Sequence, residues 1–235
     1  AASNGNSLVA IVVHYVYALN LDVRLGLDLR KLVSFLVKLQ AGYNRIPFHN
    51  HIHAADVVHG TVFFALHDAV RRHLTPLDLY AIILAAAMHD HGHMGYTNAF
   101  HINAHDELAI TYNDMAVLES FHLASSWRLT LDVDSDPFAG FGSDQYTDAR
   151  QTIVQAILGS EMSLHFDHLT KFKTHSSSGA FDTPDRAGVR ELLTMCLHAA
   201  DVSNPSKPWA LCSNWAARVM MEFFTQGDKE RELGL

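Results

Sequence analysis

Histidine and aspartate gather in three short segments of the chain. The segments are HNHIHAAD (49–56), HDHGH (89–93) and HAAD (198–201). Zinc accepts imidazole nitrogen and carboxylate oxygen, whereas magnesium and manganese prefer carboxylate and water. Together the three segments can supply two histidines and two aspartates to one ion, and Asp90 can bridge to a second. The pattern therefore predicts a site for divalent metal ions.

The first segment favours a buried or cleft-lining position. His49, His53 and Asp56 are spaced by four and three residues, so one face of a helix can carry all three. The residues between and after them are apolar, and a buried histidine needs a hydrogen-bonding partner or a metal. In the second segment, His93 shares a face with His89 only if the helix continues past Gly92. Taken alone, that segment also fits a solvent-exposed helix end.

The third segment places Asp201 at the end of an apolar stretch, where an unpaired carboxylate is costly. A lone aspartate there could also cap the next helix. With the other two segments, however, it completes a two-ion arrangement. Two ions that share a carboxylate and a water lower the pKa of that water and clamp an in-line displacement at phosphorus. This chemistry suits a negatively charged phosphodiester better than an uncharged substrate.

Helical periodicity dominates the rest of the sequence, and no stretch alternates with the period of a strand. We therefore predict an all-α fold, with residues 1–235 forming one compact domain. The expected helices cover residues 8–19, 27–39, 50–73, 76–88, 107–127, 147–166, 185–200 and 208–226. Two polar loops are expected at residues 132–144 and 174–180.

The composition narrows the class of protein. The net charge is −8 with histidine neutral, and no basic patch is visible, which argues against a nucleic-acid partner. The two cysteines show no CxxC spacing, which favours reduced thiols and a cytoplasmic protein. No apolar run is long enough for a transmembrane segment.

Five segments in this order resemble the catalytic domain of the class I cyclic-nucleotide phosphodiesterases. They are HNHIHAADVV (49–58), HDHGH (89–93), ELAITYNDMAVLE (107–119), HAADVSNP (198–205) and FFTQGDKE (223–230). The resemblance is colinear and covers nearly the whole chain. It implies the helical, HD-type architecture of that family and hydrolysis of the 3′ phosphoester of cyclic AMP, cyclic GMP or both to the 5′-monophosphate. The substrate would be a small-molecule cyclic nucleotide.

The resemblance also implies a role for each matching residue. The ligands of a tighter, zinc-like site would be His53, His89, Asp90 and Asp201. Asp90 would also hold a second ion, magnesium or manganese, with a bridging hydroxide as the nucleophile. His49 matches the general acid that protonates the leaving O3′ and contacts substrate, and His93 matches a group beside the phosphate. Glu119 and His122 match residues that orient these histidines, and Glu161, Met162 and Asn204 match the nucleotide pocket.

Two departures from the family pattern are visible. Phe48 stands where the family often has tyrosine, so a pocket hydroxyl is missing. In the family a further segment follows the position of Leu235, and it supplies the glutamine and the aromatic residue that contact the base. We therefore expect the domain to be incomplete at its C-terminal side, which leaves the preference between cyclic AMP and cyclic GMP open. Regulatory or targeting domains are expected outside this sequence.

Two alternatives remain at this point. A module that binds cyclic nucleotide without hydrolysing it would use the same ligands, although it would not need His49. A different HD-type phosphohydrolase, such as a nucleotidase, would share HDHGH but not the other two segments. Comparing cyclic with linear nucleotides as substrates separates these possibilities.

Overall fold

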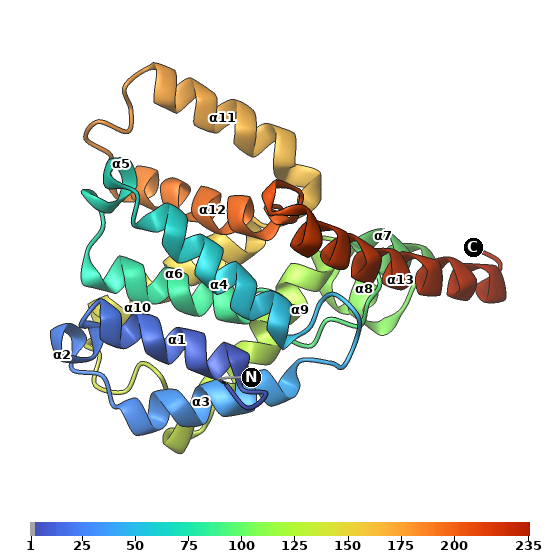
Figure 1. Ribbon diagram of the computed structural model, residues 1–235, viewed down its shortest axis with the longest axis horizontal. Coiled ribbons are helices and arrows are strands. Elements are labelled where there is room, and N and C mark those ends of the chain that lie inside the picture. The colour runs from blue at the N-terminus through green and yellow to red at the C-terminus, as the bar shows by residue number, and fades with distance from the viewer. Residues whose placement is uncertain (1–2) are drawn as a thin grey trace.

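A computed structural model describes residues 3–235, and the regular elements in that range are all helical (Figure 1). This confirms the predicted all-α fold. The α-helices, in chain order, are α1 (Ser7–Ala18), α2 (Leu21–Leu25), α3 (Leu29–Gly42), α4 (His51–Ala65), α5 (Asp68–Arg71), α6 (Pro76–Met88), α7 (Asn98–Ala104), α8 (Glu107–Tyr112), α9 (Val117–Arg128), α10 (Ser143–Leu158), α11 (His165–Ser177), α12 (Arg186–Asp201) and α13 (Trp209–Leu233). Short 3₁₀ turns are η1 (Leu129–Leu131), η2 (Val133–Ser135), η3 (Met162–Leu164) and η4 (Asn204–Ser206).

Helix α6 lies at the centre of the fold. Thr75 and Asp78 cap its start reciprocally, and Pro76 occupies the first turn, where a missing N–H costs nothing. Every residue from 78 to 88 is buried, because α4, α10 and α12 pack around the helix. A helix that is apolar on all sides is stable only when it is enclosed in this way. Its C-terminal end delivers His89 and Asp90 into the interior.

One ion-pair network joins three of these central helices. Arg186 at the start of α12 pairs with Asp78 of α6 and donates to both carboxylate oxygens of Asp148 on α10. The carboxylate of Asp78 is fully buried, so it needs this partner. The network therefore fixes the relative positions of α6 and α12, whose far ends carry His89, Asp90 and Asp201.

The outer helices are held more loosely. Helix α11 has no buried residue, and α13 buries only Trp215 and Glu222 along its 25 residues. In Figure 1, α13 leaves the body of the fold and runs outward to the C-terminus. Within residues 3–235, none of the helices combines the length and the apolarity that a membrane crossing requires.

Several predicted helices match observed ones closely. The stretch 76–88 is α6, residues 8–19 correspond to α1, and 185–200 to α12. The predicted helix 27–39 runs on to Gly42, and the predicted helix 208–226 runs on to Leu233. Apolar periodicity located these helices, but their ends depend on local capping.

Three predicted helices were too long. The stretch 50–73 ends at Ala65, because His67 adopts an extended backbone and its ring caps α5. The stretch 107–127 is divided into α8 and α9 by left-handed backbone at Asn113, Asp114 and Ala116. Asparagine and aspartate tolerate that conformation, and the periodicity of the apolar residues does not reveal it.

The stretch 147–166 also contains more than one element. Helix α10 begins earlier, at Ser143, and ends at Leu158, after which Gly159 caps it and η3 and α11 follow. Consequently the predicted loop 132–144 is shorter and holds η2, and residues 174–177 of the predicted loop 174–180 belong to the end of α11. Residues 174–177 are helical although none of them is buried, because a helix on the surface does not require apolar residues.

Candidate metal centre and acid pair

The predicted ligands come together at the ends of three central helices. His53 lies in the first turns of α4, His89 and Asp90 follow α6, and Asp201 is the last residue of α12. The Nε2 atom of His53 is 3.0 Å from Oδ1 of Asp201 and 3.4 Å from Oδ2 of Asp90. The Nε2 atom of His89 is 3.3 Å from Oδ2 of Asp90 and 3.6 Å from Oδ1 of Asp201.

The donor atoms of this cluster suit a metal ion. The Nδ1 atom of His89 donates to the carbonyl of Ala86 at 2.9 Å, which leaves the lone pair of Nε2 facing the two carboxylates. Nε2 of His89 and Oδ2 of Asp90 are both buried and form no hydrogen bond. Acceptors that face one another in the interior need a cation between them. The set of two imidazoles and two carboxylates is one that zinc accepts.

The charges of the cluster lead to the same conclusion. Burial alone would lower the pKa of His89, but Asp90 and Asp201 outweigh burial and raise it well above 6.5. Burial likewise opposes ionisation of Asp90, yet His89 and His53 hold the pKa of that carboxyl well below its usual range. Two ionised carboxylates therefore require positive charge at this point, which protons or divalent ions can provide.

His122 supports the cluster from α9. Its Nδ1 donates to the carbonyl of His91 at 2.8 Å, and its Nε2 lies 3.8 Å from Oδ1 of Asp90. Burial lowers the pKa of His122 to about 4, so the ring is neutral near pH 7. The neutral ring therefore holds the backbone of the turn that follows Asp90, and its Nε2 is too far from Asp90 for a hydrogen bond.

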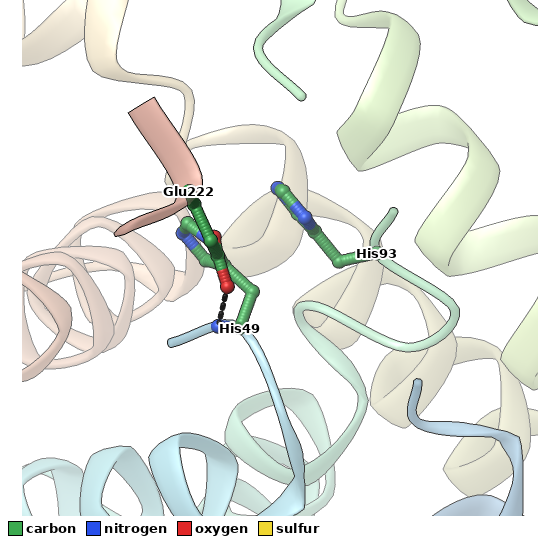
Figure 2. A group of neighbouring side chains, drawn as sticks. All are labelled: His49, His93 and Glu222. Carbon is green, nitrogen blue, oxygen red and sulfur yellow. Dashed lines mark hydrogen bonds and ion pairs between the residues drawn. The ribbon is translucent and has the colours of Figure 1, made fainter. Parts of the chain in front are cut away.

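Beside the metal cluster lies a second group of side chains, which Figure 2 shows in a close-up. His49 precedes α4, His93 lies in the turn after α6, and Glu222 comes from α13. The Nδ1 atom of His49 is 2.5 Å from Oε2 of Glu222. The other oxygen of Glu222 accepts the backbone N–H groups of Phe48 at 2.6 Å and His49 at 3.1 Å. Glu222 thereby fixes both the ring and the backbone of His49.

Glu222 is ionised in this setting. Its side chain is almost completely buried, which would raise its pKa. The hydrogen bonds from His49 and from the two backbone N–H groups outweigh burial and lower the pKa of Glu222. The contact with the carboxylate occupies Nδ1 of His49 and leaves its Nε2 free. The pair is therefore arranged to hold and release one proton.

The rings of His49 and His93 are stacked, with centroids 3.9 Å apart and planes inclined by 15°. His93 Nδ1 accepts the backbone N–H of Gly95, so the proton of the neutral ring is on Nε2. Gly95 has a φ of +85°, which a side chain would disfavour, and this backbone turns its N–H toward the ring. Burial, and then the charge on His49, lower the pKa of His93 well below 6.5.

Ligand atoms of His49, His93 and Glu222 also lie within 4.8 Å of one another, which is close enough to consider a metal site. The stacked rings argue against it. Imidazole lone pairs lie in the ring plane, so two nearly parallel rings cannot both direct a lone pair at one ion. The group is better suited to proton transfer.

A cavity of about 370 Å³ opens next to the two clusters. His49 and Asp201 line it on the side of the metal cluster, and Met162, Asn204 and Trp215 are among the lining residues on the other sides. The side chain of Glu161 accepts from the hydroxyl of Ser163 and is not among the lining residues. Of the three residues assigned to the pocket by resemblance, Met162 and Asn204 therefore line it.

Glu119, one of the two predicted supports, has another partner. It accepts from the side-chain amide of Asn98 at 3.0 Å, and burial raises its pKa. Asp56, which was expected on one helix face with His49 and His53, pairs with Lys207 and does not join the metal cluster. The expectation that His49 shares a helix face with His53 was wrong, because Asn50 caps α4 and the helix begins at His51. His93 likewise lies outside α6, which ends at Met88.

The sequence interpretation missed Glu222. The available signal was its position in MMEFF (220–224), because an acid within an apolar run of a helix needs a partner. It also missed the Tyr43 hydroxyl, which donates to the carbonyl of Ala87 at 2.9 Å and holds the end of α6. Both contacts join segments that are far apart in the chain, so spacing could not predict them.

The comparisons with known proteins bear on this arrangement. The family model for 3′5′-cyclic nucleotide phosphodiesterase matches residues 48–235, which include every residue of the two clusters. The chain belongs to the 3′,5′-cyclic nucleotide phosphodiesterase family. This confirms the resemblance that the five sequence segments indicated.

Individual members of the phosphodiesterase family are similar to this chain along its whole length. The human dual specificity calcium/calmodulin-dependent 3′,5′-cyclic nucleotide phosphodiesterase 1B is 39% identical over 236 residues; the match covers 100% of this chain and 43% of the relative. The human dual specificity calcium/calmodulin-dependent 3′,5′-cyclic nucleotide phosphodiesterase 1C is 35% identical to this chain. That match covers 100% of this chain and 33% of the relative. The chain thus spans less than half the length of these relatives.

A solved structure shows the same fold. The phosphodiesterase domain of the RhoPDE fusion protein from the choanoflagellate Salpingoeca rosetta superposes with a TM-score of 0.92 at 32% sequence identity. The match covers 97% of this chain and 72% of that one. The helices that carry the two clusters are therefore arranged as in a phosphodiesterase domain.

Proposed function

We propose that this protein hydrolyses 3′,5′-cyclic nucleotides to 5′-monophosphates. The observation that carries the proposal is the juxtaposition of a buried His₂Asp₂ cluster and an acid pair, His49 and Glu222, on one cavity. Residues 1–235 would form one catalytic domain, and the two free cysteines fit a cytoplasmic location.

His53, His89, Asp90 and Asp201 would hold zinc at the tighter site, and Asp90 would also hold magnesium or manganese at the second. Two such ions supply Lewis-acid stabilisation of the phosphate and a water of lowered pKa. The chain's own part is to fix the geometry: α4, α6 and α12 hold the ligands, and His122 holds the carbonyl of His91 in the turn that carries Asp90.

His49 would act as the general acid. Glu222 holds its Nδ1 side, so the proton that leaves is the one on Nε2. Transfer to O3′ neutralises the leaving alkoxide as the P–O bond breaks, and a histidine pKa suits this near neutral pH. His93, with its proton on Nε2, can donate a hydrogen bond to a phosphate oxygen beside His49.

The cavity accepts the rest of the nucleotide. Its wall is mainly apolar, formed by residues such as Met162 and Val219, and suits the flat face of a base. Relatives of this chain are named as dual specificity enzymes, and we propose both cyclic AMP and cyclic GMP as substrates.

Metal removal tests this function. Protein treated with a chelator and then desalted should lose hydrolysis of cyclic AMP and cyclic GMP, and adding zinc with magnesium or manganese should restore it. Linear 5′-nucleotides serve as the control substrates. Turnover of linear nucleotides in place of cyclic ones would instead indicate a nucleotidase, and tight cyclic-nucleotide binding without product would indicate a binding module.

A further inference from the structure

The second half of α13 is attached to the fold by one polar side chain. None of its residues after Glu222 is buried. Within residues 3–235, the hydrogen bonds that join residues 223–235 to an earlier part of the chain come from Gln226 and end on Thr97. Buried apolar side chains therefore do not hold this half of the helix, and Gln226 is its anchor.

Both ends of the Gln226 amide bind Thr97. Oε1 accepts the backbone N–H of Thr97 at 2.9 Å, and Nε2 donates to its hydroxyl at 3.2 Å. Nε2 also donates to the carboxylate of Glu230 at 2.8 Å. A backbone N–H can only donate and a carboxylate can only accept, so these partners fix which end of the amide faces each of them.

Thr97 ends the turn that connects the metal ligands to α7. Its hydroxyl accepts the N–H of Phe100 and caps that helix. Gly95, in the same turn, lies against Glu222, because a Cβ atom on Gly95 would be 3.7 Å from Cγ and Cδ of that side chain. The turn 93–97 therefore meets α13 at two places, Glu222 and Gln226.

These two places lie on one face of α13, since residues four apart in a helix are neighbours. Figure 2 shows Glu222 and His93 reaching His49 from different segments of the chain. Glu222 binds Nδ1 and the backbone N–H of His49, and His93 stacks on its ring. The position of α13 relative to the turn thus decides whether both groups reach His49 together.

We propose that Gln226 is a positioning residue for the general acid: it binds Thr97 and so keeps Glu222 and His93 on His49. The inference rests on the proposed function of His49. Gln226 does not line the cavity, and its hydrogen-bond partners are Thr97 and Glu230, so it acts through Glu222. Without the contact to Thr97, α13 separates from the turn in part of the molecules, and there His49 lacks its partner.

Hydrolysis of two substrates by Gln226→Ala tests this role. The kcat for cyclic AMP should fall about tenfold, the factor that corresponds to the net free energy of one or two hydrogen bonds. The kcat for a diester with a p-nitrophenolate leaving group should fall by less than about twofold, because that group departs without a proton. KM should stay within about twofold of wild type for both substrates, since Gln226 is not among the residues of the cavity wall.

An exchange of amide and carboxylate separates the hydrogen bonds from packing. Gln226→Glu places a second carboxylate beside Glu230 and should behave like Gln226→Ala. In Gln226→Glu combined with Glu230→Gln, the N–H and hydroxyl of Thr97 and the amide at position 230 can all donate to the carboxylate, so kcat should return to within about threefold of wild type. Thr225→Ala changes an exposed neighbour and should match wild type.

Hydrogen exchange of backbone amides tests the coupling without turnover. Glu222 accepts the N–H groups of Phe48 and His49, so these two amides should exchange about tenfold faster in Gln226→Ala. Amides in the middle of α6 should keep their wild-type rates, because that helix is buried and does not contact Gln226. Nuclear magnetic resonance gives the exchange rate of each amide separately.

Two results would overturn the inference: equal losses of kcat on the two substrates in Gln226→Ala, or wild-type exchange rates at Phe48 and His49 in that variant. If the exchange pattern appears while the wild-type protein forms no 5′-monophosphate, the proposed function fails and the positioning by Gln226 stands. If cyclic AMP is hydrolysed but the exchange pattern is absent, the reverse holds.

Discussion

The two sides of the candidate site are built differently. The metal cluster lies at the ends of α4, α6 and α12, and α6 alone is buried along residues 78–88. The groups that would handle the proton and the base come from a loop, from η4 and from α13, which buries two of its 25 residues. A charged cluster tolerates no misplacement, because each unpaired group costs free energy. Proton transfer and base recognition instead depend on single hydrogen bonds from the periphery.

The largest expected effect comes from the central side. Replacing Asp201 by asparagine preserves the shape but removes one of the two carboxylates that face His53 and His89. We expect hydrolysis to fall by about 10³-fold, the upper range for losing one electrostatic stabiliser of a transition state. Metal content per chain should fall in parallel, measured by mass spectrometry of the elements.

Asp228→Asn provides the matched control, because Asp228 is exposed on α13 and pairs only with Arg231. Its rate and metal content should match wild type. An Asp201→Asn protein that binds metal and turns over like wild type would show that the cluster is not the metal site.

A change on the peripheral side should lower the rate of hydrolysis less, and by a factor that depends on the leaving group of the substrate. Glu222→Gln removes the charge that holds a proton on His49, and we expect about a 10²-fold loss, the lower range for general acid–base catalysis. The loss should shrink to a few-fold on a diester with a p-nitrophenolate leaving group, which departs without a proton. Rates on the two substrates provide the test.

In Asp201→Asn, by contrast, the rates of hydrolysis of the two substrates should fall by the same factor. Glu232→Gln, an exposed change on the same helix, is the control for Glu222→Gln. Equal losses on both substrates in Glu222→Gln would assign Glu222 to holding the fold rather than to proton transfer.

The packing of α3 against the turn that follows α6 should have the next effect, on the stability of the fold. A Cβ atom on Gly42 of α3 would lie 2.1 Å from Nε2 of the buried His91. Gly42→Ala should therefore destabilise the fold by about 1–3 kcal/mol, as overpacking does. Gly227→Ala on α13 meets open space and should instead stabilise by roughly 0.5–1 kcal/mol. Urea unfolding measures both.

Adding His91→Ala to Gly42→Ala should recover part of the loss, since the clash is then removed. If the double variant is no more stable than the sum of the single changes, the clash is not the cause.

The last effect is a pH dependence of stability, which changes gradually from one pH unit to the next. Burial lowers the pKa of His91 to about 4, against 6.5 in an unfolded chain. As the pH falls below 6.5, the unfolded chain binds the proton first, so stability is lost on acidification down to about pH 4. The contribution is roughly 1 kcal/mol per pH unit in that window.

Urea unfolding of metal-free protein at pH 7, 6 and 5 should show this slope, and His91→Gln should show a smaller one. An identical slope in the two proteins would mean that His91 does not remain neutral in the folded state.

Sequence reasoning named the residues that the structure brings together on the central side, and it named fewer of those on the peripheral side. His53, His89, Asp90 and Asp201 follow or interrupt apolar helices, and that signal is local. The partner of His49 was not predicted, because Glu222 lies 173 residues away and only the packing of α13 brings it close. The pairing of Lys207 with Asp56 was missed for the same reason, because the two residues are 151 positions apart.

The helix boundaries were also predicted better for the buried helix α6 than for the helices at the surface. Residues 76–88 were predicted correctly because capping residues and apolar composition agree there. The stretch 107–127 was predicted as one helix because the left-handed residues that divide it are ordinary polar residues and an alanine. Apolar patterns locate buried helices, whereas surface breaks depend on single backbone angles.

Product identification tests the central claim most directly. Cyclic AMP and cyclic GMP would be incubated with the chain in zinc and magnesium, with and without chelator, and the products separated by chromatography. The account predicts 5′-AMP and 5′-GMP only when metal is present. A 3′-monophosphate, or equal product formation in the chelated sample, would contradict it.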